Sequence, residues 1–314
     1  MNLVSKILSS ILVLGGILFL CPYSSKAAIR ERWELEFTHK PPRVFTYVDP
    51  LNNRTNHAYI IFSVTNPTTK NISLSLDFCI KTDKGRFYQD SIRPLVEGEI
   101  IVKEEKLGGL TLGLRKERIK ELKQESKYLN CRELRDKAQI KPQETITGIA
   151  IFEEIDSRAK ELDVMIGGLV DIVKQRYERD LEGILEDKLV YEYECKLLKT
   201  TYASHGDEFY SHGKEKIKIK KTWVIRNYGP IGTKDTVPIL IQSLEDMNPL
   251  IREIAFLLLR RLTDQEFKYV PEKELGENKE AVLRWQEWWA VNKDRLVYDL
   301  SLNKFSIAEK EDTE

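Results

Sequence analysis

The residues with the greatest capacity for chemistry lie between His205 and His212. Two imidazoles and two carboxylates, one of them that of Asp207, fall within this segment. Imidazole and carboxylate are ligands that suit zinc and similar ions, so the segment is a candidate metal site. The spacing matches no standard zinc motif, and the glycine, aspartate and serine residues are equally typical of a polar connection between two strands. The sequence leaves both interpretations open, with His205, Asp207 and His212 as weak metal candidates.

Other motifs of catalysis or cofactor binding are absent from the sequence. It contains no G-x-S-x-G nucleophile elbow, no phosphate-binding loop with Gly-Lys-Ser/Thr and no G-x-G-x-x-G. Carboxylates are abundant, but a single sequence does not show which of them meet across a cleft. We therefore expect a non-catalytic protein without a cofactor. The alternative is a metal-binding protein or a hydrolase that uses the His205–His212 loop.

Charge and composition restrict the class of partner. The 314 residues carry 50 basic and 50 acidic side chains, and 41% of the residues are hydrophobic. Proteins that bind nucleic acid usually carry a basic excess on one face, so nucleic acid is not an expected partner. The hydrophobic content is that of a chain with ordinary folded cores. We expect an unknown protein partner, and the sequence does not indicate the oligomeric state.

The N-terminus has the layout of a targeting segment. Residues Ile7–Leu20 form an apolar run without a charged residue, and small residues precede a cut between Ala27 and Ala28. This layout predicts a signal peptide over residues 1–27 and an exported protein, periplasmic or extracellular, whose mature chain has no transmembrane span. A retained signal anchor is one alternative, although the run is shorter than the roughly 20 residues that span a bilayer. A lipid anchor on Cys21 is another.

Three cysteines are left after removal of the signal peptide. They are Cys79, Cys131 and Cys195, so at most one internal disulfide can form. An oxidising compartment permits such a bridge, but the sequence does not choose among the three pairings. We expect reduced, half-buried cysteines, with one disulfide as the alternative.

The middle of the chain has the alternating pattern of strands. Residues 72–80 carry apolar side chains at every second position, which predicts a strand with one buried and one solvated face. Residues 58–65 read as a second strand that pairs with it in a β-hairpin. Similar patterns predict further strands at residues 33–37, 98–103, 145–152, 162–166, 190–202 and 214–226. Many short strands with turn residues between them predict an antiparallel β-sandwich over residues 30–228.

Two helical insertions are expected within this sandwich. Residues 114–138 are dense in lysine, arginine and glutamate with a thin apolar stripe, so we expect a surface helix that covers a sheet edge. Residues 169–185 place Val173 and Tyr177 on one helical face, and the alternation of Val170 and Ile172 also permits a strand at the start of the segment. The strand that follows Ala58, the alternating strand after it and the turn Asp83-Lys84-Gly85 together loosely resemble the immunoglobulin-like modules of exported bacterial proteins.

Residues 236–262 predict two helices joined by a tight turn. Asn248 can cap the second helix, and Pro249 suits its first position, where no N–H is needed. An aspartate that ends the first helix and an arginine early in the second resemble a HEAT repeat. The resemblance implies a structural role in the turn for Asp246 and Arg252. No second copy occurs at the period of about 40 residues that such arrays need, so we expect one compact helical pair rather than a solenoid.

A third helix is expected over residues 278–292. Trp285, Trp288 and Trp289 fall on one of its faces together with Ala281. An exposed tryptophan face could anchor a sugar or a peptide. Packing is the interpretation that we prefer, because the second helix of the pair is apolar nearly all round and needs a cover on its far side.

The sequence as a whole predicts an α+β protein with two domains. An antiparallel β-sandwich with helical insertions, residues 30–228, precedes a small all-α, HEAT-like domain, residues 232–298, and a frayed acidic tail, residues 303–314. We expect an exported, non-catalytic binding or scaffolding protein of the cell envelope. Its binding surface is expected at the junction of the two domains.

Overall fold

The computed structural model describes residues 32–49, 51–105, 121, 126–156, 158–178, 188–203 and 216–308. Strands and helices both contribute to these residues, which confirms a mixed α+β class. Arg32–Glu314 belong to one compact unit. The signal peptide with Cys21 and Ala27, the segment from His205 to His212 and the last residues of the acidic tail lie outside the described residues.

The strands form two larger sheets. The first has the order β1-β3-β9-β7 with β2 also paired to β3, and only β7 runs parallel to its neighbour. Its strands are β1 (Glu36–His39), β2 (Arg43–Val48), β3 (Arg54–Thr65), β7 (Tyr128–Leu129) and β9 (Thr145–Phe152). The second sheet is antiparallel and has the order β11-β12-β10-β5-β6 with β13 paired to β12. Its strands are β5 (Asp77–Thr82), β6 (Phe87–Gln89), β10 (Glu161–Gly167), β11 (Val173–Glu178), β12 (Lys188–Ala203) and β13 (Ile217–Pro230).

The remaining elements are short strand pairs and helices. Two small ladders join β4 (Ile72–Ser73) to β8 (Gln139–Ile140) and β14 (Leu296–Asp299) to β15 (Lys304–Ile307). The helices are α2 (Pro94–Glu104), α4 (Cys131–Lys137), α5 (Thr236–Ser243), α6 (Pro249–Thr263) and α7 (Lys279–Asn292), with a 3-10 turn η2 (Leu275–Asn278) before α7.

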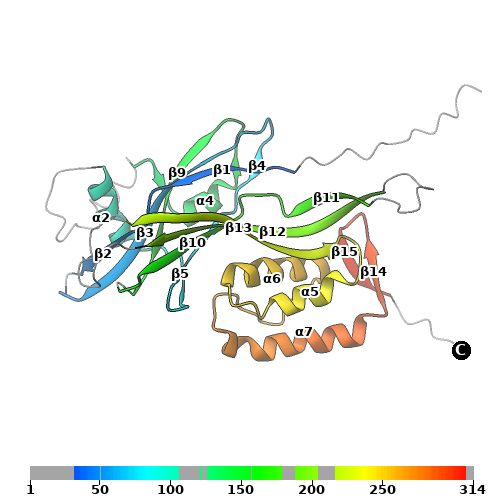
Figure 1. Cartoon of the computed structure of the whole chain (residues 1–314). Coiled ribbons are helices and arrows are strands. Elements are labelled where there is room, and N and C mark those ends of the chain that lie inside the picture. Colours follow the sequence, from blue (N-terminus) through cyan, green and yellow to red (C-terminus); the bar gives the residue numbers. More distant parts are fainter. Residues whose placement is uncertain are drawn as a thin grey trace, which may run out of the picture. The chain divides into compact units, whose positions relative to one another are not determined.

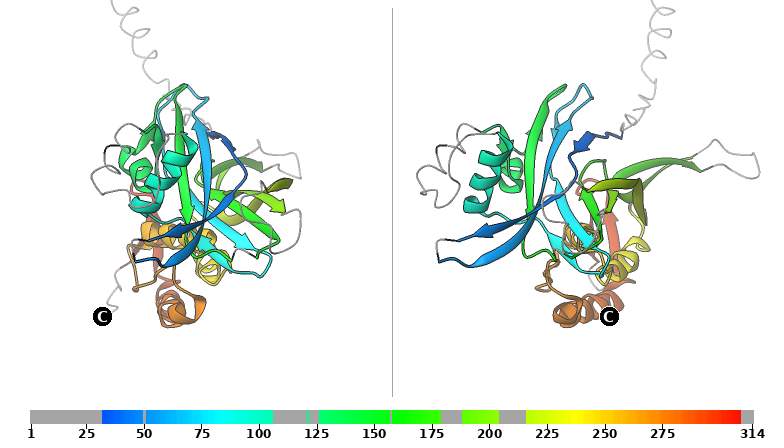
Figure 2. Two further views of the ribbon diagram at one scale, coloured as in Figure 1. Left: turned by 90° about the vertical axis from the view of Figure 1, so that its left-hand side faces the viewer. Right: turned by 60° about the vertical axis from the view of Figure 1, so that its left-hand side comes forward.

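The two larger sheets enclose the first hydrophobic core. Side chains at alternate positions point inward, such as Ile60 and Phe62 from β3 and Phe78 and Ile80 from β5. The intervening side chains of β3 and β9 point to the opposite side, where Tyr59 and its neighbours form a second core with α2. Figure 2 shows α2 on the side of the first sheet away from the second. Strands that are buried on both faces explain the nearly continuous apolar runs in the sequence.

The C-terminal helices cover the outer face of the second sheet (Figure 1). Tyr193 and Leu197 of β12 and Met165 of β10 belong to the same core as Leu240, Leu259 and most other buried residues of α5 and α6. The next residue of β12, Leu198, belongs to the core between the sheets. The alternation of β12 therefore serves two different cores, and the helices share their core with the sheet.

The helical pair begins and ends at the predicted residues. Asn248 Oδ1 accepts a hydrogen bond from the N–H of Leu250 (3.1 Å), and Pro249 occupies the first turn of α6. Trp285 of α7 is completely buried, in edge contact with the rings of Phe267 and Trp288, whose ring centroids lie 4.8 Å and 6.0 Å away. Trp288 and Trp289 are half-buried and pack against the same core.

Residues 304–307 of the predicted frayed tail form strand β15, and three further predicted elements are wrong. Residues 98–103 lie in helix α2, which Pro94 begins, because a short buried apolar run fits a helix as well as a strand. Within residues 169–185, residues 173–178 form strand β11 instead of a helix. Residues 58–65 and 72–80 do not form a hairpin, since β3 pairs with β9 while residues 72–80 divide into β4 and β5 of other sheets.

The predicted helix over residues 114–138 is described only in part. Residues 131–137 form α4, whose cap Asn130 accepts a hydrogen bond from the N–H of Glu133 (3.0 Å). Residues 128–129 form strand β7 instead, and most of the earlier residues lie outside the described ranges.

Candidate functional site

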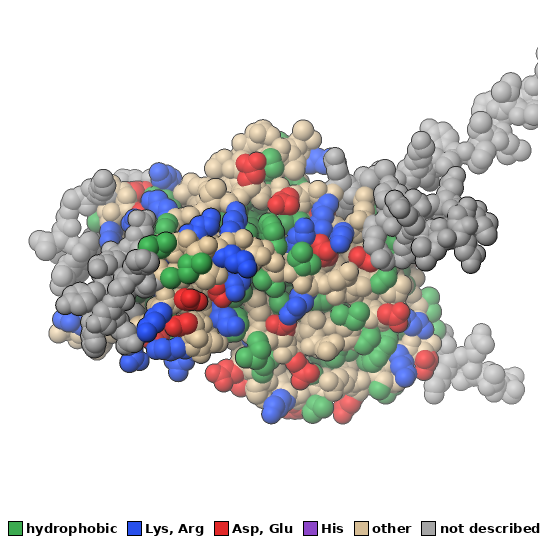
Figure 3. Space-filling view, in the orientation of Figure 1, with side chains coloured by type: hydrophobic (Ala, Val, Ile, Leu, Met, Phe, Trp, Pro, Cys, Tyr) green, Lys and Arg blue, Asp and Glu red, His purple; other side chains and the backbone are tan. Residues whose placement is uncertain are grey.

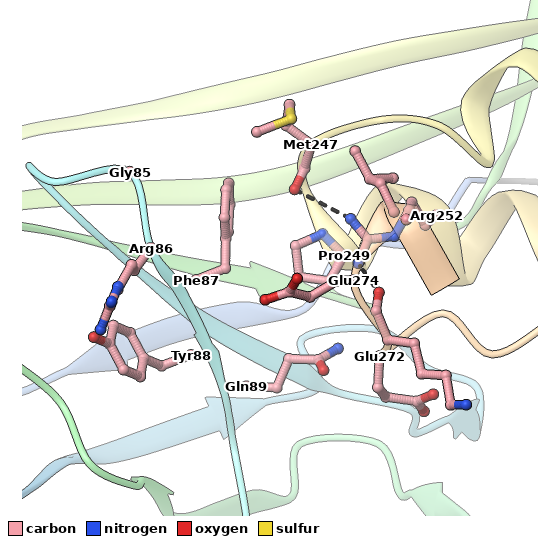
Figure 4. Close-up of a pocket in the computed structure, with 13 residues that line it drawn as sticks. Gly85, Arg86, Phe87, Tyr88, Gln89, Met247, Pro249, Arg252, Glu272 and Glu274 are labelled. Atoms are coloured by element: carbon pink, nitrogen blue, oxygen red, sulfur yellow. Dashed lines mark hydrogen bonds between the residues drawn. The ribbon is translucent and has the colours of Figure 1, made fainter. Parts of the chain in front are cut away.

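A pocket of about 710 Å³, the junction pocket, lies where the second sheet meets the helices. Strand β6 and the turn before it form one wall, and the start of α6 and the segment before η2 form the other (Figure 4). The side chains of Phe87 and Gln89 point toward the helical wall, whereas those of Arg86 and Tyr88 point away from it. The pocket is lined by Gly85, Arg86, Phe87, Tyr88, Gln89, Met247, Pro249, Arg252, Glu272, Lys273, Glu274, Leu275 and Gly276.

Arg252 holds the helical wall together. Its guanidinium is buried and donates hydrogen bonds to the carbonyl oxygens of Asp246 (2.9 Å), Met247 (3.2 Å), Pro271 (2.8 and 3.2 Å) and Lys273 (3.2 Å). These carbonyls come from both sides of α6, so one side chain fixes the turn before the helix and the segment after it. Because its donors are already engaged, Arg252 serves as a support of the pocket.

Asp246 supports the same turn through other partners. Its Oδ1 accepts a hydrogen bond from the N–H of Asn248 (2.8 Å), and its Oδ2 accepts one from Arg226 of β13 (3.2 Å). The two side chains singled out by the HEAT resemblance therefore meet at one turn. Arg252 contacts the backbone carbonyl of Asp246 rather than its carboxylate. Asn248 Nδ2 lies 3.3 Å from the sulfur of Met165, which ties the turn to β10.

A cluster of carboxylates adjoins the pocket. Burial and the nearby charge of Asp77 raise the pKa of Glu253 to about 8, and Glu272 on the pocket wall acts in the same direction. Burial and the charge of Asp90 raise the pKa of Asp77 to about 6. Arg135 is the cation that opposes these shifts. Near neutral pH the cluster therefore holds protons that isolated carboxyl groups would have released.

The lining of this pocket is chemically mixed. Its lining combines an aromatic ring, a thioether, an amide and charges of both signs, and it contains no cysteine, serine or histidine. Burial raises the pKa of the thiols of Cys79, Cys131 and Cys195 to about 12, so they are poor nucleophiles near neutral pH. All three are free and fully buried, without a disulfide among them. Among the described residues, no group of three or more His, Cys, Asp and Glu side chains is arranged to hold a metal ion.

A second pocket of about 370 Å³ lies on the first sheet beside the start of α2. His57 lines it and is 4% exposed, and its Nε2 lies 2.9 Å from the hydroxyl of Thr55. Burial lowers the pKa of His57, so the ring is neutral near pH 7. Arg93 and Glu153 form an ion pair at the rim. The ring of His57 packs against Phe45 and Tyr47, which is the environment of a histidine in a core.

The surface away from these pockets is mixed in character. Figure 3 shows Lys and Arg side chains above the strands and many hydrophobic side chains above the helices. Strand β13 pairs only with β12, and its Lys218, Lys220 and Lys221 are exposed. Charged side chains on an edge strand discourage pairing with other chains.

The structure brings together some of the predicted residues and adds others. Asp246 and Arg252 meet at the turn before α6, where Arg252 lines the pocket, and Trp285 lies in the core that the helices share with the second sheet. The candidates His205, Asp207 and His212 lie outside the described residues. The sequence did not point to Gln89, Glu253 or Glu272, since they are separated along the chain and belong to no motif. The only sequence-based indication of this site was the predicted binding surface at the junction of the strand-rich and helical domains.

No family model matches the chain, and no curated protein or solved structure is similar to it. None of the helices in the described part of the chain combines the length and the apolar character needed to cross a membrane.

Proposed function

We propose that the protein is an exported, non-catalytic binding or scaffolding protein of the cell envelope that holds a protein partner in the junction pocket. The observation that carries the proposal is the pocket itself. It is lined by segments from residues 85–89 and 247–276, and a buried arginine with five hydrogen bonds fixes its helical wall. A fixed wall suits recognition, because little conformational freedom is lost on binding.

The architecture supports the same proposal. We propose that the two larger sheets constitute a β-sandwich domain and that α5, α6 and α7 constitute a small HEAT-like domain docked on it. Ligand sites occur preferentially where domains meet. Export is supported by the layout of residues 1–27, which predicts cleavage before Ala28.

Site-specific photocrosslinking tests the proposal. A photoreactive amino acid replaces Glu274, which lines the pocket and is exposed, or Leu283, which is exposed on α7 outside the pocket lining. In cells that express the full chain, we expect a discrete adduct from position 274 and none from position 283. Equal adducts from the two positions, or none from position 274, would refute binding at the pocket.

Fractionation of the same cells tests export. We expect the chain in the envelope fraction, with Ala28 as the first residue. A chain in the cytoplasm that still begins with Met1 would refute export.

A further inference from the structure

The wall of the junction pocket that β6 forms is an unpaired sheet edge. β6 is the last strand in the order of the second sheet and pairs only with β5. In that ladder, the N–H of Thr82 bonds to the carbonyl of Arg86, and the N–H of Asp90 bonds to the carbonyl of Phe78. Hydrogen-bonded pairs alternate along an antiparallel ladder. The backbone groups of Phe87 and Gln89 therefore point away from β5.

These outward backbone groups have no other partner in the described chain. No hydrogen bond beyond the β5–β6 ladder includes the N–H or the C=O of Phe87 or Gln89. Natural proteins protect open edges with charged side chains, as β13 does with its lysines. β6 has the sequence Phe-Tyr-Gln and carries no charge. Its edge therefore keeps two N–H and two C=O groups available to an added strand.

The pocket supplies contacts for the side chains of such a strand. Phe87 and Met247 offer an apolar surface. On the helical wall, the carboxylates of Glu272 and Glu274 form no ion pair with a described residue.

Among the described residues, the cations of the pocket wall form no ion pair with these carboxylates. The guanidinium of Arg252 is engaged by four carbonyls, and Lys273 is paired with Glu277 at 3.4 Å. Arg86 lines the pocket just before β6, and its side chain points away from the helical wall. Glu272 and Glu274 are therefore charged side chains of the pocket with which a basic side chain of a ligand can pair.

We propose that the junction pocket binds an extended peptide segment of the partner, which adds as a strand to β6 and places a lysine or arginine beside Glu272. The proposal rests on binding at the pocket and specifies the chemistry of the partner. Backbone hydrogen bonds to an open edge supply affinity in strand addition, and the pocket for a side chain supplies specificity. The shortness of β6 limits the backbone contribution, so the basic side chain carries much of the selectivity.

Three labelled peptides test the preference for charge. They are acetylated heptapeptides of alternating threonine and valine whose central residue is lysine, glutamate or glutamine. Binding to the mature chain is measured by fluorescence anisotropy at low salt. We expect the lysine peptide to bind about tenfold more tightly than the glutamate peptide, because charge-assisted hydrogen bonds are worth about 1.5–3 kcal/mol. Glu272→Lys should reverse this order.

A matched pair of variants tests the strand addition. Gln89→Pro removes the outward N–H and leaves the ladder to β5 intact, since the N–H of Gln89 takes no part in it. Gln89→Ala removes the side chain and keeps the N–H. We expect Gln89→Pro to weaken the lysine peptide about tenfold and Gln89→Ala to change its affinity less than about twofold. If Gln89→Pro does not fold, as judged by its thermal unfolding, the reversal by Glu272→Lys decides the proposal.

Other results would overturn the proposal. Equal binding of the three peptides, equal affinities of the two Gln89 variants, or no binding at about 1 mM peptide would each do so. Self-association of the chain that Gln89→Pro abolishes would assign the edge to a second copy instead. If a photocrosslink forms from position 274 but one of these results is obtained, the pocket binds a partner that does not add as a strand. If no photocrosslink forms from position 274, the proposed function is refuted as well.

Discussion

Replacement of Arg252 tests whether one side chain fixes the helical wall of the pocket. Arg252→Met keeps the aliphatic stem and removes five hydrogen bonds to the carbonyls of Asp246, Met247, Pro271 and Lys273. A buried acceptor without a donor costs about 1–3 kcal/mol. The pocket admits water to some of these carbonyls, so the lower value applies to each of the four. We expect the free energy of unfolding to fall by about 4 kcal/mol.

Equilibrium urea unfolding, followed by tryptophan fluorescence, measures this change. Arg252→Lys is the matched control, because lysine keeps the charge but lacks the planar fork that reaches both sides of α6. It should lose less stability than Arg252→Met. Asp246→Asn should lose about 1 kcal/mol, since the carboxylate makes only two hydrogen bonds near the surface. A loss below about 1 kcal/mol for Arg252→Met would show that the turn holds without the arginine and refute the reasoning.

Three further predictions concern the core and the carboxylate cluster. The pKa of Glu253 is raised above its unfolded value, so the folded state binds more protons than the unfolded state between about pH 4 and pH 8. The protein should therefore lose stability as pH rises through that window. Glu253→Gln should flatten the dependence of the urea midpoint on pH. Trp285→Ala should cost about 3–5 kcal/mol in urea unfolding, whereas Ala at the exposed Leu283 should cost less than about 0.5 kcal/mol. Gly168 and Gly85 both have a positive φ. A Cβ at Gly168 would lie 1.7 Å from the carbonyl oxygen of Ser75, whereas a Cβ at Gly85 would meet nothing within 4 Å. Gly168→Ala should therefore lower the melting temperature far more than Gly85→Ala.

Each of these three predictions has an outcome that contradicts it. An unchanged pH dependence for Glu253→Gln would show that other groups produce the slope. Equal losses from Trp285→Ala and Leu283→Ala would mean that the tryptophan is not packed as the structure has it. Equal melting temperatures for the two glycine variants would contradict the close approach at Gly168.

Local patterns in the sequence located most of the strands and the helical pair. Residues 145–152 were predicted as a strand and form β9, because a short run rich in apolar and β-branched side chains is typical of a buried strand. Asn248 and Pro249 marked the start of α6 for reasons that operate within a few residues. Such signals depend on neighbouring residues and can be read from one chain.

The pairing of the strands could not be read in this way. The predicted hairpin failed because β3 finds its partner in β9, some 80 residues later, and no turn residue signals that choice. β11 was taken for a helix because Val173 and Tyr177 have helical spacing, yet its pairing with β12 decides the conformation. The carboxylate cluster is a product of the same distant contacts, since Asp77 and Glu253 come from different layers.

The shared core of the second sheet and the helices has a consequence for the order in which the chain can fold. Cys79, Met165, Tyr193 and Leu197 share their core with α5, α6 and α7, whose residues come late in the chain. Until α5 and α6 have emerged, one face of a finished sheet exposes a continuous apolar surface of the kind that promotes aggregation. A truncation before Thr236 should therefore yield an insoluble chain rather than a smaller folded protein. Once α5 and α6 have packed on the sheet, this apolar surface is covered. A chaperone that holds the unfolded chain would be needed only before that step.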